Sequence, residues 1–128
     1  MNEAERTAGM PETPQYRYAE RVGNQLFLAG QVPHDSQGQL VGVGNAFLQA
    51  SQCLHNLSIV LSVHEFTLAE VRELVVYVVG EQDQLSAAWK ATTKFFAGQV
   101  PPATLLGVSR LGYIGQLVEV GATVVKAQ

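Results

Sequence analysis

The run Val71–Val79 constrains the fold more than any other segment, because it is the most β-branched stretch of the chain. Branched side chains favour strands, and a nearly continuous apolar run is typical of a strand buried on both faces. Amphipathic helical patterns lie on either side of it. One covers 46–64 and begins after Asn45, a suitable N-cap residue, and the other is predicted to be capped by Asp83.

Four further strands are predicted, two towards each end of the chain. They cover residues 16–22, 25–29, 103–111 and 116–126. Turn-forming residues at 23–24 and at 112–115 join each pair as a hairpin. The order β-β-α-β-α-β-β predicts an α+β fold with one sheet and both helices on one of its faces. The other face of that sheet then needs a cover.

The charge content points to the same need. Charged residues make up only 15% of the chain, against about 25% in an average soluble domain. A small domain with so few charges gains by burying part of its surface against copies of itself. We therefore expect an oligomer.

Residues 1–14 are polar, contain two prolines, and are predicted to be a flexible leader ahead of a single domain over 15–128. No apolar stretch reaches membrane-spanning length and no signal-type core occurs, so we expect a cytoplasmic protein. Net charge is −3 with scattered basic residues, which argues against a nucleic-acid or membrane surface.

Metal and cofactor sites are not predicted. Cys53 is the only cysteine and is expected to be a buried core residue rather than a nucleophile. The three histidines, His34, His55 and His64, are dispersed and do not supply a ligand set. No glycine-rich phosphate loop is present.

Glu119 is the leading candidate for a functional residue. It is the one carboxylate in the apolar run 117–125, where an ionised group is costly unless it is paired or hydrogen-bonded. The alternative is a strand residue that faces water, but its same-face neighbours Leu117, Gly121 and Val125 are apolar or small. We therefore favour a cleft, where carboxylates are often functional.

Other candidates lie on or at the ends of predicted strands. Tyr16 begins the first strand, and Gly30-Gln31 closes the second with exposed backbone donors. Alternation places Thr104, Leu106 and Arg110 on one face of the fourth strand. Arg110 could pair with a carboxylate ligand or, equally, with a surface acid.

These residues resemble the Rid family of reactive intermediate deaminases, the YjgF-like proteins that also carry older endoribonuclease labels. The similar stretches are Val22–Pro33 with its Gly30-Gln31-Val32-Pro33 loop, the helix positions Gln49, Cys53-Leu54 and Asn56-Leu57, and then Phe95-Phe96, Pro102-Ala103, Val108–Leu111 and Val118–Val120. The resemblance implies a chorismate-mutase-like homotrimer. Three sheets would form a closed barrel with the helices outside and a small-molecule cleft between neighbouring subunits.

The resemblance also implies an activity, the hydrolysis of enamines or imines such as 2-aminoacrylate to a 2-oxo acid and ammonia. The family's carboxylate-binding Arg, its Cys, its loop Ser and a helix Asn correspond here to Thr104, Leu106, Ala29 and Trp89. The retained positions are Tyr16, Gly30, Gln31 and Glu119.

Replacing a guanidinium by a hydroxyl at Thr104 removes a strong carboxylate anchor. We therefore expect a neutral or less acidic ligand and weak or absent activity on 2-aminoacrylate. Three functions stay open. The first is an imine or enamine hydrolase in which Glu119 activates water with help from Tyr16, and the second is a non-catalytic trimer that binds a metabolite. The third, an endoribonuclease, is less favoured because no basic stripe exists to hold phosphates.

Overall fold

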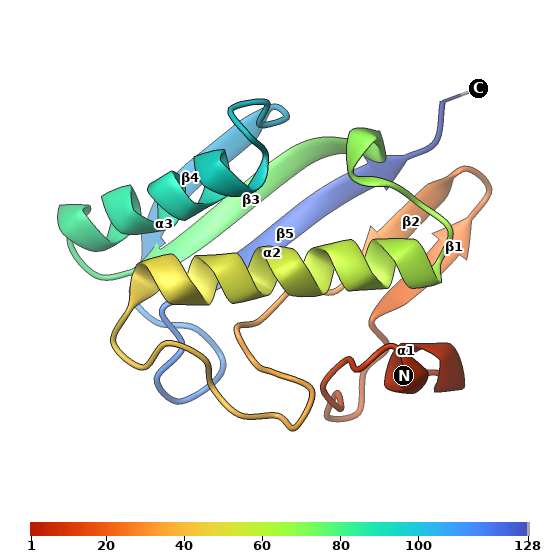
Figure 1. Cartoon of the computed structure of the whole chain (residues 1–128), viewed down its shortest axis with the longest axis horizontal. Coiled ribbons are helices and arrows are strands. Elements are labelled where there is room, and N and C mark those ends of the chain that lie inside the picture. The colour runs from red at the N-terminus through yellow and green to blue at the C-terminus, as the bar shows by residue number, and fades with distance from the viewer. Residues whose placement is uncertain (128) are drawn as a thin grey trace.

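The computed structural model describes residues 1–127. Its strands are β1 (Ala19–Val22), β2 (Gln25–Leu28), β3 (Val71–Val79), β4 (Ala103–Val108) and β5 (Val118–Val125). Its helices are α1 (Glu3–Thr7), α2 (Ala46–Val63) and α3 (Gln82–Phe95), with the 3-10 turn η1 at Leu68–Glu70. The strands form one mixed sheet in the order β1-β2-β5-β3-β4, and α2 and α3 cover one of its faces (Figure 1). The α+β prediction is confirmed.

The pairing of the last two strands differs from the prediction. They do not form a hairpin, because β3 lies between them, antiparallel to β5 and parallel to β4. Parallel neighbours need a crossover connection, and α3 supplies it between β3 and β4. In the resulting register Tyr77 lies opposite Glu119 on one side and Leu106 on the other.

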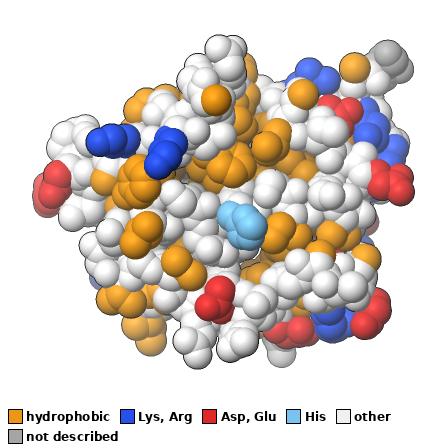
Figure 2. Space-filling model, in the orientation of Figure 1, with side chains coloured by type: hydrophobic (Ala, Val, Ile, Leu, Met, Phe, Trp, Pro, Cys, Tyr) orange, Lys and Arg blue, Asp and Glu red, His pale blue; other side chains and the backbone are white. Residues whose placement is uncertain are grey.

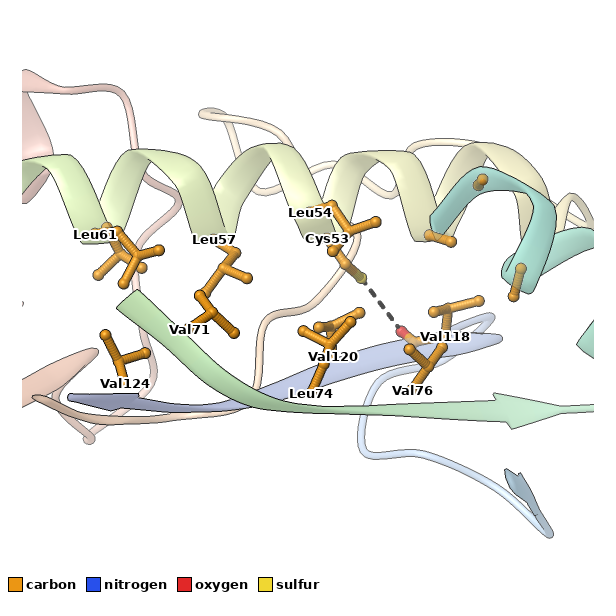
Figure 3. Close-up of a cluster of buried hydrophobic side chains, with 14 of the residues drawn as sticks. Cys53, Leu54, Leu57, Leu61, Val71, Leu74, Val76, Val118, Val120 and Val124 are labelled. Carbon is orange, nitrogen blue, oxygen red and sulfur yellow. Dashed lines mark hydrogen bonds between the residues drawn. The ribbon is translucent and has the colours of Figure 1, made fainter. Parts of the chain in front are cut away.

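The core lies between α2 and the sheet (Figure 3). The helix contributes Cys53, Leu54, Leu57 and Leu61; the sheet contributes Val71, Leu74, Val76, Val118, Val120 and Val124; none is more than 4% exposed. Burial of these side chains removes apolar surface from water and so stabilises the packing of α2 against the sheet. Cys53 is fully buried, as predicted, and its Sγ lies 3.6 Å from the Val118 carbonyl oxygen. Burial raises the pKa of its thiol.

The two helix starts illustrate capping. Asn45 caps α2 as predicted, because its side chain accepts a hydrogen bond from the Leu48 amide at 2.9 Å. The predicted cap of α3, Asp83, is wrong. Glu81 is the N-cap and its amide donates to Gln84 Oε1 at 3.1 Å, while Asp83 lies in the first helical turn, where the helix dipole favours an acid.

The first residues, for which the sequence predicts a flexible leader, make contacts with the rest of the domain. Helix α1 begins with a capping box between Asn2 and Glu5. Glu5 is 2% exposed, and its Oε2 lies 2.7 Å from Nε2 of His64 at the end of α2. Met10 is buried, and the Tyr18 hydroxyl donates to the Pro11 carbonyl at 2.6 Å. A few side chains thus attach an otherwise polar segment to the domain.

The sheet face opposite the helices has no cover within residues 1–127. Along β3 every second residue from Leu74 is buried beneath the helices, whereas Val75 and Tyr77 on the other face are only half-buried. The prediction that this strand is buried on both faces therefore holds for one face of the single chain. Glu119 lies on the open face, beside Tyr77.

Candidate functional site

A cavity of about 380 Å³ opens on the uncovered sheet face around Glu119. Its walls come from β2 and the loop after it, from β3, from β5 and from the segment after β4. The lining residues are Leu28, Gly30, Val75, Tyr77, Leu111, Glu119, Gly121, Ala122 and Thr123. Among the described residues no Lys, Arg or His lines it, so Glu119 sets its charge.

Gln116 fixes one oxygen of the Glu119 carboxylate. Its Nε2 donates to Glu119 Oε1 at 3.1 Å and also to the Val118 carbonyl at 3.0 Å. Its own Oε1 accepts from the Tyr113 amide at 3.2 Å, and the side chain is buried. Because Gln116 is held on both sides, it orients the carboxylate and leaves Oε2 as the oxygen nearest Gly30.

Gly30 makes room for that carboxylate. The β2–β5 ladder stops after Leu26 and Val124, and the two segments meet again only where Gln31 bridges Val120. A Cβ at Gly30 would overlap the Glu119 carboxyl group. The φ of Gly30 is not positive, so the close approach, rather than backbone conformation, is the reason for glycine.

Gln31 contributes through its backbone. Its amide donates to the Val120 carbonyl at 2.7 Å and its carbonyl accepts from the Val120 amide at 3.1 Å. The side chain is 1% exposed and does not line the cavity; its Nε2 donates to the Ala29 carbonyl at 3.1 Å. Its Oε1 has no hydrogen-bond partner among residues 1–127. Gln31 therefore anchors the Ala29–Gly30 loop to β5.

Tyr16 lies near the Glu119 cavity but not in it. It lines a smaller neighbouring cavity of about 90 Å³ with Tyr113 and His34, and its hydroxyl is 3.4 Å from that of Tyr113. Burial, then the contact with Tyr113 and the nearby Glu119 charge, raise the pKa of Tyr16, which keeps its phenol neutral. The Tyr113 hydroxyl meets that of Tyr16, but it is the Tyr113 backbone amide that donates to Gln116, so these contacts form no continuous hydrogen-bond chain from Tyr16 to Glu119.

The other predicted site residues are not gathered around Glu119 within one chain. Register places Thr104 beside Val75 and Leu106 beside Tyr77, so both lie on the open face without lining the cavity. Arg110 is exposed beyond the end of β4. Trp89 belongs to α3, which covers the opposite face.

Sequence reasoning missed three residues of the site, Tyr77, Tyr113 and Gln116. Alternation along β3 could have placed Tyr77 on the open face with Val75. The other two lie in the turn before β5. Their hydrogen bonds with each other and with Glu119 join residues three positions apart, whereas the turn itself is held by Gln49 of α2 through the Gly115 carbonyl and the Leu117 amide.

Two other kinds of site are not found. Among residues 1–127 no three His, Cys, Asp or Glu side chains gather where they could hold a metal ion. Within the same residues, no helix combines the length and apolar character needed to cross a membrane.

The sequence profile of the endoribonuclease L-PSP family matches residues 8–126. The chain belongs to this family.

A RutC family protein of Pyrococcus horikoshii is 29% identical over 96 residues, 75% of each chain. A Thermotoga maritima protein with a provisional endoribonuclease assignment shares the fold with a TM-score of 0.83 and 26% identity over 94% of each chain. The YjgF gene product of E. coli has a TM-score of 0.83 at 19% identity over 94% of this chain and 95% of that one, which shows the fold alone. Membership of the Rid, or YjgF-like, family is thereby confirmed.

We expect the close contact between Gly30 and Glu119 to appear as energetic coupling. Gly30→Ala should lower the free energy of unfolding by about 1–3 kcal/mol, because the new Cβ displaces the carboxylate. In a Glu119→Ala background the overlap is gone, and the same change should be neutral or stabilise by about 0.4–1 kcal/mol. Urea unfolding of the four proteins in this double-mutant cycle measures the difference.

Gly112→Ala is the matched control, since its φ is not positive and no atom lies within 4 Å of the added Cβ. An equal cost of Gly30→Ala in both backgrounds would contradict the contact.

Proposed function

We propose that this protein hydrolyses an imine or enamine that lacks a carboxylate beside the reacting carbon. Members of the Rid family act on enamine and imine intermediates, and hydrolysis requires a base that activates water. The observation that carries the proposal is the Glu119 carboxylate, held at one oxygen by Gln116 in a cavity that no described cation lines. Such a cavity favours a neutral or protonated imine over an anionic substrate.

The proposed reaction runs through one tetrahedral intermediate. Glu119 takes a proton from water as the water oxygen attacks the imine carbon, and the C=N double bond becomes a single bond as nitrogen takes that proton from Glu119. The carbinolamine then passes its hydroxyl proton to the nitrogen, by way of Glu119. The C–N bond breaks with its electrons on nitrogen, which gives a carbonyl compound and ammonia. Oε2 is the oxygen available for this role, since Oε1 accepts from Gln116.

Two tyrosines support the reaction in different ways. Tyr77 lines the cavity, and its hydroxyl can hydrogen-bond to the substrate nitrogen. Tyr16 is proposed as a positioning residue, because it does not line the Glu119 cavity and its hydroxyl meets that of Tyr113. Its raised pKa suits a hydrogen-bond donor and does not suit a base.

A non-catalytic, ligand-binding trimer is the second candidate. It is favoured by the position of Thr104, which replaces the family's cation and lies outside the Glu119 cavity of its own chain. Melting shifts caused by a ligand without ammonia release would indicate this function. The endoribonuclease function is the least favoured, because the eight Lys and Arg residues form no stripe along the sequence to hold phosphates.

We propose a homotrimer in which the open sheet faces meet. The support is the uncovered face, where Thr104 and Leu106 of one chain could meet the Glu119 cavity of the next. Sedimentation should give a particle of about three times the 13.8 kDa chain mass. A stable 13.8 kDa monomer at micromolar concentration would contradict the trimer.

Glu119→Gln should lower turnover of a non-carboxylate imine by roughly 10² to 10⁴, the range typical of losing a general base. Gln has the same shape and its amide oxygen can still accept from Gln116, so the melting temperature and assembly should stay unchanged. Ammonia release measures turnover. Full activity in the variant would leave the carboxylate with a structural role only.

Turnover of 2-aminoacrylate should be about ten- to hundredfold below that of a family enzyme with Arg at the position of Thr104, under matched conditions. Losing a charge-assisted contact at Thr104 costs on the order of 1.5–3 kcal/mol, which corresponds to that ratio. Thr104→Arg should raise 2-aminoacrylate turnover, and Thr104→Val, which adds no charge, should not. Turnover equal to that of the Arg-containing enzyme would show that another cation, such as Arg110, has replaced the anchor.

A further inference from the structure

We propose a second binding site, for a small amphipathic anion with a planar apolar body and a carboxylate or phosphate head. It is a groove between the start of α2 and the C-terminal half of α3, on the helix side of the sheet. The groove has a volume of about 790 Å³ and is lined by Phe47, Lys90, Thr93, Lys94, Ala97 and Gly98. This anion groove is independent of the Glu119 cavity.

Two cations define the charge of the anion groove. Lys90 and Lys94 lie four residues apart on α3, about 6 Å along the helix axis, and face the same side. Neither has a carboxylate oxygen within 4.0 Å among the described residues, and no acid lines the groove. Lys94 lies in the last turn, where it also offsets the negative end of the helix dipole. Lys90 lies a turn earlier, so the dipole does not account for the pair.

Phe47 provides the apolar part of the anion groove. The Lys94 Nζ lies 5.9 Å from the centroid of the Phe47 ring, so the ammonium group and the ring face the same space. In Figure 2 basic side chains over α3 lie beside hydrophobic ones. At the open end, Ala97 and Gly98 have φ values of 50° and 79° and carry small or no side chains. A planar group can therefore lie against Phe47 while its head reaches the lysines.

Size and charge together select the ligand class. The volume lies within the roughly 300–1,000 Å³ of small-molecule sites. Two ammonium groups without carboxylate partners favour an anion, although the chain as a whole carries a net charge of −3. The apolar ring disfavours a fully hydrated inorganic ion. The expected ligands, whether carboxylates or phosphates, therefore share an anionic head group on an apolar body.

The probes are 2-naphthoate, 2-naphthyl phosphate and the uncharged 2-naphthylmethanol, titrated by calorimetry into the full-length protein and mapped by amide chemical shifts. Both anions should bind more tightly than the alcohol and shift the amides of Thr93 and Gly98. The anion that binds more tightly indicates whether a carboxylate or a phosphate head group is preferred. In the Lys90→Gln/Lys94→Gln variant their binding should weaken about three- to tenfold, since exposed ion pairs contribute modestly.

Lys126→Gln is the matched control, because this third lysine lies beside Glu70, with Nζ–Oε1 3.5 Å, outside the anion groove. It should leave binding unchanged. Equal binding of the alcohol, equal loss in Lys126→Gln, or shifts confined to the residues around Glu119 would each overturn the proposal. Glu119→Gln should bind the anions normally, so this test is separate from that of the hydrolase.

Discussion

The register between β3 and β5 is the constraint on which both the core and the site depend. It sets Val76 and Val120 towards α2 and, one residue along each strand, Tyr77 and Glu119 towards the open face. A slip of one residue in either strand would turn its buried valines outwards. In β5 it would also place the Glu119 carboxylate in the core, at a large desolvation cost. The β3–β5 pairing therefore fixes both the packing of the core and the position of the site residues.

Periodicity and burial arguments predicted much of this architecture. The apolar stripe of α2 and the Asn45 cap were readable because both are local signals. Strand order was not, since β4 and β5 are neighbours in sequence yet β3 separates them. The attachment of the first residues depends on the contact between Glu5 and His64, 59 positions apart, which no local pattern reveals.

The candidate site was predictable at its charged centre and not at its periphery. Glu119 stands out because an isolated carboxylate in an apolar strand needs an explanation. Gln116, which holds it, lies in a turn that Gln49 of α2 fixes through the Gly115 carbonyl and the Leu117 amide, contacts that no local pattern reveals. Tyr16, Trp89 and Arg110 lie outside the cavity that Glu119 lines.

The buried thiol of Cys53 has a practical consequence. It lies at the centre of the contact between α2 and the sheet and has no exposed surface. A thiol reagent can reach it only when the helix moves off β5, and the raised pKa keeps the reactive thiolate scarce. The chain therefore carries a natural reporter of local opening. The labelling rate of one native side chain would follow how often this layer of the protein separates, without any engineered probe.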